Sequence, residues 1–323
     1  MLKLAWLNSG WGMNKQLPQE TAFFALNRIE NYHWLTIFYF AVWSGIILFY
    51  FKRIPQAGVF LILHVTGMMV SFFLSGIQPS FRIVRILRDW YPAFLLPLFF
   101  TALHYLIPAI HPAHIDFELI QIDRMITGND PTVWVDRFYH PMLTEIFQFS
   151  YSTFYILPLF VLLPLYKSGQ KSEFRHDAFI VLIAFYFSYV CYLIFPALGP
   201  RFFLAHLHTT PLDGYKVFHF FNATLNGLEN IQWDAFPSAH VAITLLVAYF
   251  TFLHFKRIFY FLSPIILSLV LSTIYLRYHY LIDVLAGFVI VAVLIFIEKL
   301  LRRKTILKKG SSEISLMIPV VEK

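Results

Sequence analysis

The sequence has few charged residues and almost no cysteine. Charged side chains make up 13% of its 323 residues, whereas a soluble domain carries about 25%. The single cysteine, Cys191, lies within an apolar run, which excludes a disulfide framework within the chain and a metal site built from several cysteines. With 59% hydrophobic residues and a mean hydropathy of +0.65, the composition indicates an integral membrane protein with many spans.

Positive charge exceeds negative charge, and aromatic residues are abundant. The formal net charge is +7, and the basic residues are spread over loops and the C-terminal tail. We interpret this charge as a topology signal and as contact with anionic lipids, and we expect no nucleic-acid partner. Aromatic residues reach 19%, with 37 phenylalanines, which is typical of side chains that contact lipid and of aromatic belts at a membrane surface.

Eight apolar stretches approach the length of about 20 residues that a helical span requires. They cover roughly residues 34–51, 55–77, 91–110, 144–166, 177–198, 239–255, 258–277 and 280–300. The sequence therefore predicts an all-α, multi-span membrane bundle of about eight spans. The predicted regions are an N-terminal interfacial segment (1–33), N-terminal spans with surface helices (34–143), a core that carries the motifs described below (144–300) and a basic cytoplasmic tail without obvious later structure (301–323).

Two polar stretches lie between these spans. Residues 111–143 are expected to lie on the membrane surface as short amphipathic helices. Residues 199–237 form the longest predicted loop and lead directly into His240. Because cytoplasmic segments carry an excess of lysine and arginine, the basic tail is placed inside the cell. Alternating spans then place this loop and the starts of both motif helices on the non-cytoplasmic face, although Lys52 and Arg53 also fall there.

Two short polar motifs, Phe236–His240 and Tyr278–Asp283, stand at the starts of long apolar runs. His279 and Asp283 are four residues apart, so on a helix they share one face and the carboxylate can accept the Nδ1 proton. This arrangement leaves Nε2 available as a nucleophile or base. Together with His240 they form a candidate phosphoryl-transfer site, since helix N-termini favour a bound anion.

The same residues have a structural interpretation that the sequence leaves open. His279 and Asp283 could be only a polar pair that ties two helices together, and His240 could be only an interfacial histidine. Ionisable residues within membrane spans are costly and usually functional, which favours a catalytic role for all three.

Further residues could bind a phosphate group. Ser238 suits a helix cap and could also touch phosphate. Arg201 is either an interfacial anchor or a bidentate phosphate clamp, and Arg277 is either a second clamp or a snorkelling residue. A metal site is the less favoured interpretation of three loop histidines, which are more often solvated. These are His206, His208 and His219.

These motifs resemble those of the type-2 phosphatidic acid phosphatase superfamily of membrane enzymes. Pro237–His240 matches the family's second motif, Pro-Ser-Gly-His, with alanine in place of glycine. Ser272–Thr273, followed after five residues by His279 and after three more by Asp283, matches the third motif, with threonine in place of arginine. The first motif, a lysine followed after six residues by Arg-Pro, is not found, and Gly199–Arg201 stands in its place.

The departures from the family pattern point to one branch. Leu276–Gly287 looks more like the inositol phosphorylceramide synthases, and Arg88–Pro92 looks like bacterial members of that branch. The resemblance implies a six-helix catalytic core in which His279 is the nucleophile or base. It further implies that Asp283 orients His279 and that His240 is the general acid on the leaving oxygen.

From this resemblance we expect a metal-independent lipid phosphotransferase that forms a phosphohistidine and uses no cofactor. Its substrates would be phospholipids or sphingolipids, and its site would face the non-cytoplasmic side of a bacterial inner membrane or an equivalent membrane. Arg277 or Arg201 would replace the missing family arginine. The alternative is a lipid phosphatase acting on phosphatidate, a sphingoid phosphate or a polyprenyl diphosphate. A transporter or lipid scaffold is less favoured, because the charges gather at helix ends.

Overall fold

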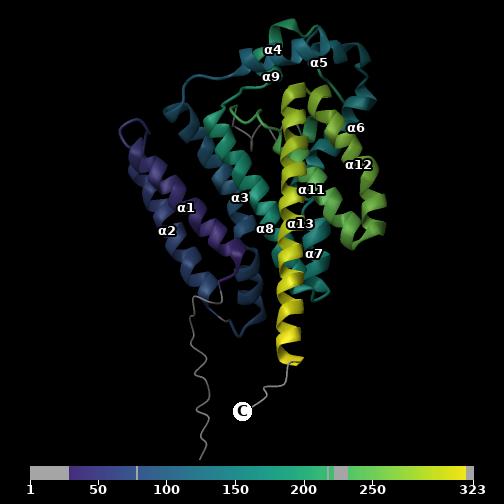
Figure 1. The fold of residues 1–323 in the computed structure, drawn as a ribbon. Coiled ribbons are helices and arrows are strands. Elements are labelled where there is room, and N and C mark those ends of the chain that lie inside the picture. The colour runs from purple at the N-terminus through teal and green to yellow at the C-terminus, as the bar shows by residue number, and fades with distance from the viewer. Residues whose placement is uncertain (1–28, 78, 217, 222–231, 318–323) are drawn as a thin grey trace, which may run out of the picture.

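The chain folds into a bundle of long helices that short helices cover at one end (Figure 1). The computed structural model describes residues 29–77, 79–216, 218–221 and 232–317, with side chains described as far as residue 302. The long bundle is built from α1 (Asn31–Phe49), α2 (Ala57–Gly76), α3 (Arg82–Ile110), α6 (Pro141–Ser152), α7 (Leu159–Lys167), α8 (Lys171–Ile194), α11 (Ala239–His254), α12 (Lys256–Tyr275) and α13 (Leu281–Met317). The short elements are α4 (Asp116–Thr127), α5 (Pro131–Trp134), η2 (Val135–Phe138), η3 (Thr153–Tyr155), α9 (Pro200–Phe203) and η4 (Ala205–Leu207).

All eight predicted apolar stretches are helical in the structure, and two of them fall short of an unbroken span. Among the residues that the structure describes, six helices are long and apolar enough to cross a membrane: α1, α2, α3, α8, α12 and α13. The α6–η3 segment and α7 are bent by 42° and count as a seventh span only when taken together. The 16 residues of α11 make it a shorter apolar helix. The fold is thus an all-α, multi-span membrane bundle.

Two predicted boundaries are wrong, and both for local reasons. The third helix begins at Arg82 rather than near residue 91, because Arg88 pairs with Asp89 at 2.8 Å and donates to the Ile77 carbonyl at 3.1 Å. These contacts keep a charged turn within the helix. The predicted unstructured tail continues as α13 to Met317, since leucine, arginine and lysine are good helix formers.

The N-terminal prediction is only partly covered by the described residues. Most of the predicted interfacial segment, residues 1–28, lies outside them. Its last residues already belong to α1, which begins at Asn31. The predicted surface segment 111–143 does contain short helices, α4 and α5, which lie over one end of the bundle (Figure 1).

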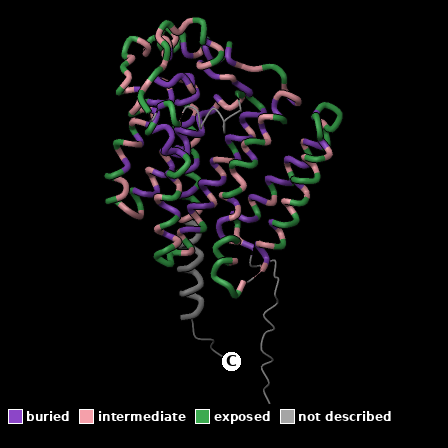
Figure 2. The backbone as a smooth tube through the Cα atoms, turned by 180° about the vertical axis from the view of Figure 1, so that it is seen from behind, coloured by how far each residue is buried: buried purple, intermediate pink, exposed green. Residues whose placement is uncertain are grey.

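Aromatic side chains pack the centre of the bundle. Tyr39 on α1 stacks on Tyr186 of α8 with ring centroids 4.2 Å apart, and Phe99 of α3 lies 4.7 Å from the same tyrosine. Trp43 is fully buried beside them. Buried positions follow the inward sides of the helices, whereas exposed positions follow the outward sides (Figure 2). Because many exposed side chains on α1, α2 and α12 are large and apolar, the outer surface suits contact with lipid.

Candidate active site

Three chain segments meet under the short helices and form the framework of the site. The first follows α8, the second precedes α11, and the third runs from the end of α12 into the first turn of α13: residues 196–201, 234–238 and 276–283. Backbone hydrogen bonds join them in pairs. The N–H of Ala235 donates to Ala197 at 3.1 Å, and the N–H of Arg201 donates to Arg277 at 2.8 Å. The N–H of Ser238 donates to Asp283 at 3.1 Å. Residues far apart in the sequence are therefore held at fixed positions.

His240 and His279 face one another within this framework. Their ring centroids lie 5.6 Å apart at an interplanar angle of 57°, and both side chains are buried. His240 is the second residue of α11 and stacks on Tyr151 at 4.3 Å. The Nε2 atoms of both histidines have no hydrogen-bond partner among the described residues. Two imidazoles that each keep one nitrogen available can act together on one substrate atom or on two bonded atoms.

The predicted hydrogen bond between His279 and Asp283 is not the one that the structure contains. The Nδ1 atom of His279 lies 2.7 Å from the Ala235 carbonyl oxygen and 3.6 Å from the Asp283 Oδ2. Because α13 begins at Leu281, His279 precedes the helix and does not share its face. The Asp283 carboxylate instead accepts the backbone N–H of Tyr280 at 2.7 Å.

The Ala235 contact determines the tautomer of His279. A carbonyl oxygen can only accept a hydrogen bond, so Nδ1 carries the proton and Nε2 carries a lone pair. Burial lowers the pKa of His279 to about 4, although the Ala235 hydrogen bond and the charge of Asp234 oppose the shift. The imidazole is therefore neutral near pH 7, which is the form that a nucleophile requires.

Ser238 is a helix cap. Its hydroxyl oxygen accepts the N–H of Val241 at 3.3 Å, and the side chain is fully buried at the start of α11. The cap fixes the helix end that carries His240. Of the two roles considered for Ser238, the capping role is confirmed, and contact with a phosphate stays a prediction.

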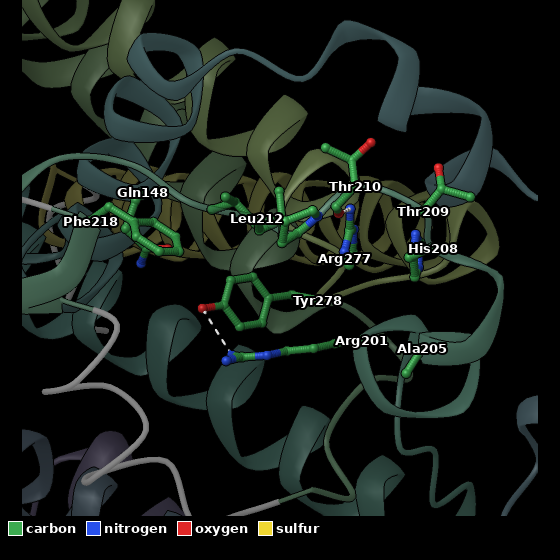
Figure 3. A pocket seen from close by; sticks show the side chains of 12 residues that line it. Gln148, Arg201, Ala205, His208, Thr209, Thr210, Leu212, Phe218, Arg277 and Tyr278 are labelled. Carbon is green, nitrogen blue, oxygen red and sulfur yellow. Dashed lines mark hydrogen bonds between the residues drawn. The ribbon is translucent and has the colours of Figure 1, made fainter.

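Arg201 and Arg277 line one polar pocket of about 460 Å³ (Figure 3). The Arg201 guanidinium lies 5.3 Å from the ring centre of Tyr278, and its Nη1 donates to the Tyr278 hydroxyl at 3.4 Å. Arg277 donates through Nη2 to Asp136 at 2.8 Å and to the Thr210 carbonyl. These contacts point Arg277 into the loop layer, so the snorkelling interpretation is wrong.

Arg277 also adopts an uncommon backbone conformation, with a φ of +65°. A non-glycine residue in the left-handed region costs on the order of 1–3 kcal/mol and persists only where its surroundings hold it. Here its carbonyl accepts the Arg201 N–H and its side chain binds Asp136. The strained position places Tyr278 and His279 directly after it, which links the polar pocket to the histidine pair.

The polar pocket contains three buried polar atoms without a hydrogen-bond partner among the described residues. They are Gln148 Oε1, His208 Nε2 and Arg277 Nε. His208 faces Asp136 through Nδ1 at 3.1 Å, and burial followed by the charge of Arg277 lowers its pKa. A neutral His208 that donates from Nδ1 to Asp136 leaves Nε2 as an acceptor. The pocket thus offers two acceptors and one donor to a ligand.

A second cavity of about 430 Å³ borders His240 from the apolar side. Its walls come from α3, η3 and α8, and they are mainly aromatic and aliphatic: Leu96, Phe100, Phe154, Phe185 and Tyr189. The ring of Tyr151 lies between residues of the polar pocket and the apolar cavity, because it stacks on both His240 and Tyr278 at 4.3 Å. His240 therefore borders the apolar cavity, and Tyr278, the residue before His279, borders the polar pocket.

The loop histidines considered as metal ligands are not brought together in the described part of the chain. His208 pairs with Asp136, and His219 faces Asp213 at 3.2 Å on the surface. A different group has ligand atoms within 4.8 Å of one another: Glu173, Asp177 and His254. Arg302 already pairs with Glu173 and Asp177. His254 is about 20 Å along α11 from His240 at 1.5 Å per residue, so this group belongs to the opposite end of the bundle.

The sequence singled out both histidines and both arginines, whose catalytic roles stay predictions, and it did not point to several residues around them. Tyr151 and Gln148 lie within a predicted apolar span, and a polar side chain in such a span is a signal that could have identified them. Asp136 and the carbonyl of Ala235 had no such signal, because their roles depend on how distant loops meet.

The comparisons with known proteins agree with the site's motifs. The family model described as PAP2 superfamily matches residues 117–297, which is more than half of the chain. A PA-phosphatase related-family protein of Dictyostelium discoideum is 25% identical over 206 residues, which cover 53% of this chain and 37% of that protein. The chain thus spans just over a third of the relative's length. No solved structure shows a significant match.

The close contact between two of the loops predicts the effect of a methyl group at Gly199. This glycine has a φ of +87°, and a Cβ there would lie 2.9 Å from the Tyr278 carbonyl oxygen. Gly128 has a φ of +76° with nothing within 4 Å of its Cβ position, which makes it a matched control. We expect both alanine variants to lose about 1–2 kcal/mol of stability from the positive φ. Only Gly199→Ala should also lose turnover, by about 10²-fold, because it displaces Tyr278 and His279.

Thermal unfolding and turnover of the purified variants in detergent would measure both effects. Equal turnover in Gly199→Ala and Gly128→Ala would show that the contact with Tyr278 does not position the site.

Proposed function

The chain belongs to the PAP2 superfamily, and we propose that it transfers a phospho-headgroup from one membrane lipid to another through His279, Asp283 and His240. Family membership implies lipid phosphatase or phosphotransferase activity at a multi-pass membrane protein. The observation that carries the proposal is the pair of buried imidazoles 5.6 Å apart, whose Nε2 atoms have no partner among the described residues.

In the first half of the proposed reaction, the Nε2 lone pair of His279 attacks phosphorus. Burial and the neighbouring His279 lower the pKa of His240, whereas the negative charge of a bound phosphate would raise it and favour the protonated imidazole. In that state the P–N bond forms, the P–O bond to the leaving alcohol breaks, and His240 gives its proton to the departing oxygen. In the second half, an acceptor hydroxyl attacks the phosphohistidine while His240 takes its proton. The P–N bond then breaks and His279 recovers its lone pair.

Asp283 has an electrostatic role in this proposal. Its carboxylate lies 3.6 Å from His279 Nδ1. In the proposal it stabilises the positive charge that the imidazole gains when Nε2 bonds to phosphorus. It also holds the N–H of Tyr280, the residue after His279. The orienting hydrogen bond, which the sequence assigned to Asp283, is made with the Ala235 carbonyl instead.

In the proposal Arg201 and Arg277, which line the polar pocket, supply positive charge for the phosphate, and Ser238 at the N-terminus of α11 contacts it. In the proposal these groups stand in for a metal ion, and no cofactor takes part. The apolar cavity beside His240 suits the hydrocarbon part of a lipid. These features support phospholipid or sphingolipid substrates.

The polar pocket supports transfer to a hydroxyl-bearing partner. Gln148 Oε1 and His208 Nε2 are acceptors without partners among the described residues, so a ligand must bring hydrogen-bond donors. Hydroxyl groups meet this need beside two arginines, whereas an ammonium group would be repelled by them. A hydroxylated headgroup fits an activity similar to that of inositol phosphorylceramide synthases.

The second candidate function is hydrolysis of a lipid phosphoester, and the name of the Dictyostelium discoideum relative favours it. Water would then replace the acceptor, and the substrate would be phosphatidate, a sphingoid phosphate or a polyprenyl diphosphate. Purified enzyme should be incubated with labelled phospholipids, with and without a ceramide or diacylglycerol acceptor, and the products identified by lipid mass spectrometry. Transfer predicts a new phosphorylated lipid only with acceptor, whereas acceptor-independent release of phosphate would establish the hydrolase instead.

The role of His240 predicts a dependence on the leaving group. His240→Ala should slow cleavage of an ordinary lipid phosphoester by on the order of 10²–10⁴-fold, because an alkoxide needs a proton to leave. A substrate with a nitrophenol leaving group should lose far less rate, since nitrophenolate leaves without a proton. His279→Ala should lose rate on both substrates about equally, because both reactions need the nucleophile.

Steady-state rates of the two variants on the two substrates measure this difference. If His240→Ala slows both substrates alike, His240 binds phosphate and does not donate a proton.

We further propose that the site faces the non-cytoplasmic side of a bacterial inner membrane or an equivalent membrane. The basic tail and the short basic loops between spans support this orientation. Lys216 is exposed on the site's side of the bundle. In a Cys191→Ser background, Lys216→Cys should react with an impermeant thiol reagent in intact cells. Labelling that occurs only after permeabilisation would reverse the topology.

A further inference from the structure

The surface helix α4 carries two buried carboxylates that the proposed reaction does not use. Asp116 and Asp123 are 0% and 1% exposed. They are seven residues apart, which is close to two helical turns, so they lie on one face of α4. Neither lines the polar pocket or the apolar cavity. An ionised carboxylate is costly to bury without hydrogen bonds, so the partners of these two residues explain their burial.

Asp123 caps a helix other than its own. Its Oδ2 and Oδ1 accept the N–H groups of Leu281 and Ile282, each at 2.8 Å. These are the first two N–H groups of α13, which have no acceptor within that helix. Burial raises the pKa of Asp123, and the two N–H donors oppose the rise. The carboxylate therefore fixes the start of α13 two residues after His279.

Asp116 holds another segment of the site in the same way. Its Oδ2 and Oδ1 accept the N–H groups of Leu198 and Gly199, each at 2.8 Å. Its Oδ1 also accepts the hydroxyl of Tyr280 at 2.7 Å. His114 lies 3.1 Å from Oδ2 at the partly exposed edge of the cluster. One carboxylate thus joins the segment that leads to Arg201 to the residue that follows His279.

We propose that α4 is the positioning element of the active site, with Asp116 and Asp123 setting the separation between the Arg201 segment and the His279 segment. Neither carboxylate touches the reacting atoms, so both act through the backbone that they hold. The effect on turnover rests on the proposed function. The effect on the backbone does not, and it can be measured separately.

The chain provides a matched control for these two residues. Asp130 follows Asp123 by another seven residues, but it lies beyond the end of α4 and pairs with the exposed Arg124 at 2.8 Å. The Arg124 side chain is 49% exposed, so solvent weakens this pair, and the pair does not contact either segment of the site. Asp130→Ala also removes an aspartate carboxylate from this part of the chain, but it releases neither segment of the site. It should therefore leave turnover unchanged.

Alanine and asparagine variants at Asp116 and Asp123 test the proposal. Turnover of the labelled phospholipids in detergent micelles, with and without a ceramide acceptor, and of dioctanoyl phosphatidate without acceptor should be measured per folded protein. Asp123→Ala should lower kcat by about 10²-fold with little change in KM, because it releases the segment of the nucleophile. Asp116→Ala should mainly raise KM, because it releases the segment of Arg201. The asparagine variants keep one acceptor oxygen and should fall between alanine and the native chain.

Hydrogen–deuterium exchange of the peptides that cover residues 276–285 and 196–201 gives the readout that is independent of activity. Exchange should rise in the first peptide for Asp123→Ala and in the second for Asp116→Ala, relative to Asp130→Ala. If the native enzyme releases no product from any lipid phosphoester, the proposed function fails while the exchange result still decides whether the carboxylates hold the segments. Unchanged exchange, or faster exchange with native kcat and KM, would overturn the positioning role. If the alanine variants do not fold, the asparagine variants give the same comparison.

Discussion

A buried imidazole can act as a nucleophile only if one nitrogen holds its proton firmly and the other is open to substrate. In this protein the bond of 2.7 Å between His279 Nδ1 and the Ala235 carbonyl meets the first condition. The second condition depends on the Nε2 atom, which has no partner among the described residues. Both conditions hold only while the segment before α11 stays beside the segment before α13. Two sets of contacts keep these segments together in our proposal. One is the backbone hydrogen bonds from loop to loop, and the other is the hydrogen bonds that the carboxylates of α4 accept.

The position of the site follows from the cost of charge in a membrane. Backbone groups in a membrane span must be satisfied within the helix, so irregular segments gather where helices end. The loops that carry His240, His279 and the two arginines lie at one end of the bundle, under the short helices (Figure 1). His240 borders an apolar cavity, and Tyr278, the residue before His279, borders a polar pocket. A lipid phosphoester, which is apolar at one end and charged at the other, matches this division.

The all-α membrane bundle could be predicted from the sequence, because long apolar runs can satisfy their backbone only as helices. His240 and His279 could be found because ionisable side chains beside apolar runs are rare. The predicted hydrogen bond between His279 and Asp283 is wrong, because the four-residue spacing was read as one helix face, whereas α13 begins between the two residues. The broken span around α6 and α7 and the ionic partner of Arg277 were also missed. The broken span depends on a local bend within an apolar run. The partner of Arg277 depends on contact between segments that are more than a hundred residues apart.

The proposed reaction depends on a covalent bond between His279 and phosphorus. Rapid quench of the enzyme with a phosphorus-labelled lipid, followed by mass spectrometry of peptides, tests it most directly. The account predicts a phosphoryl group on residue 279 that is stable in base and labile in acid, that disappears when acceptor is added and that is absent from His279→Ala. The absence of labelled protein, together with inversion of configuration at phosphorus, would contradict it. His279 would then act as a base that activates the acceptor hydroxyl.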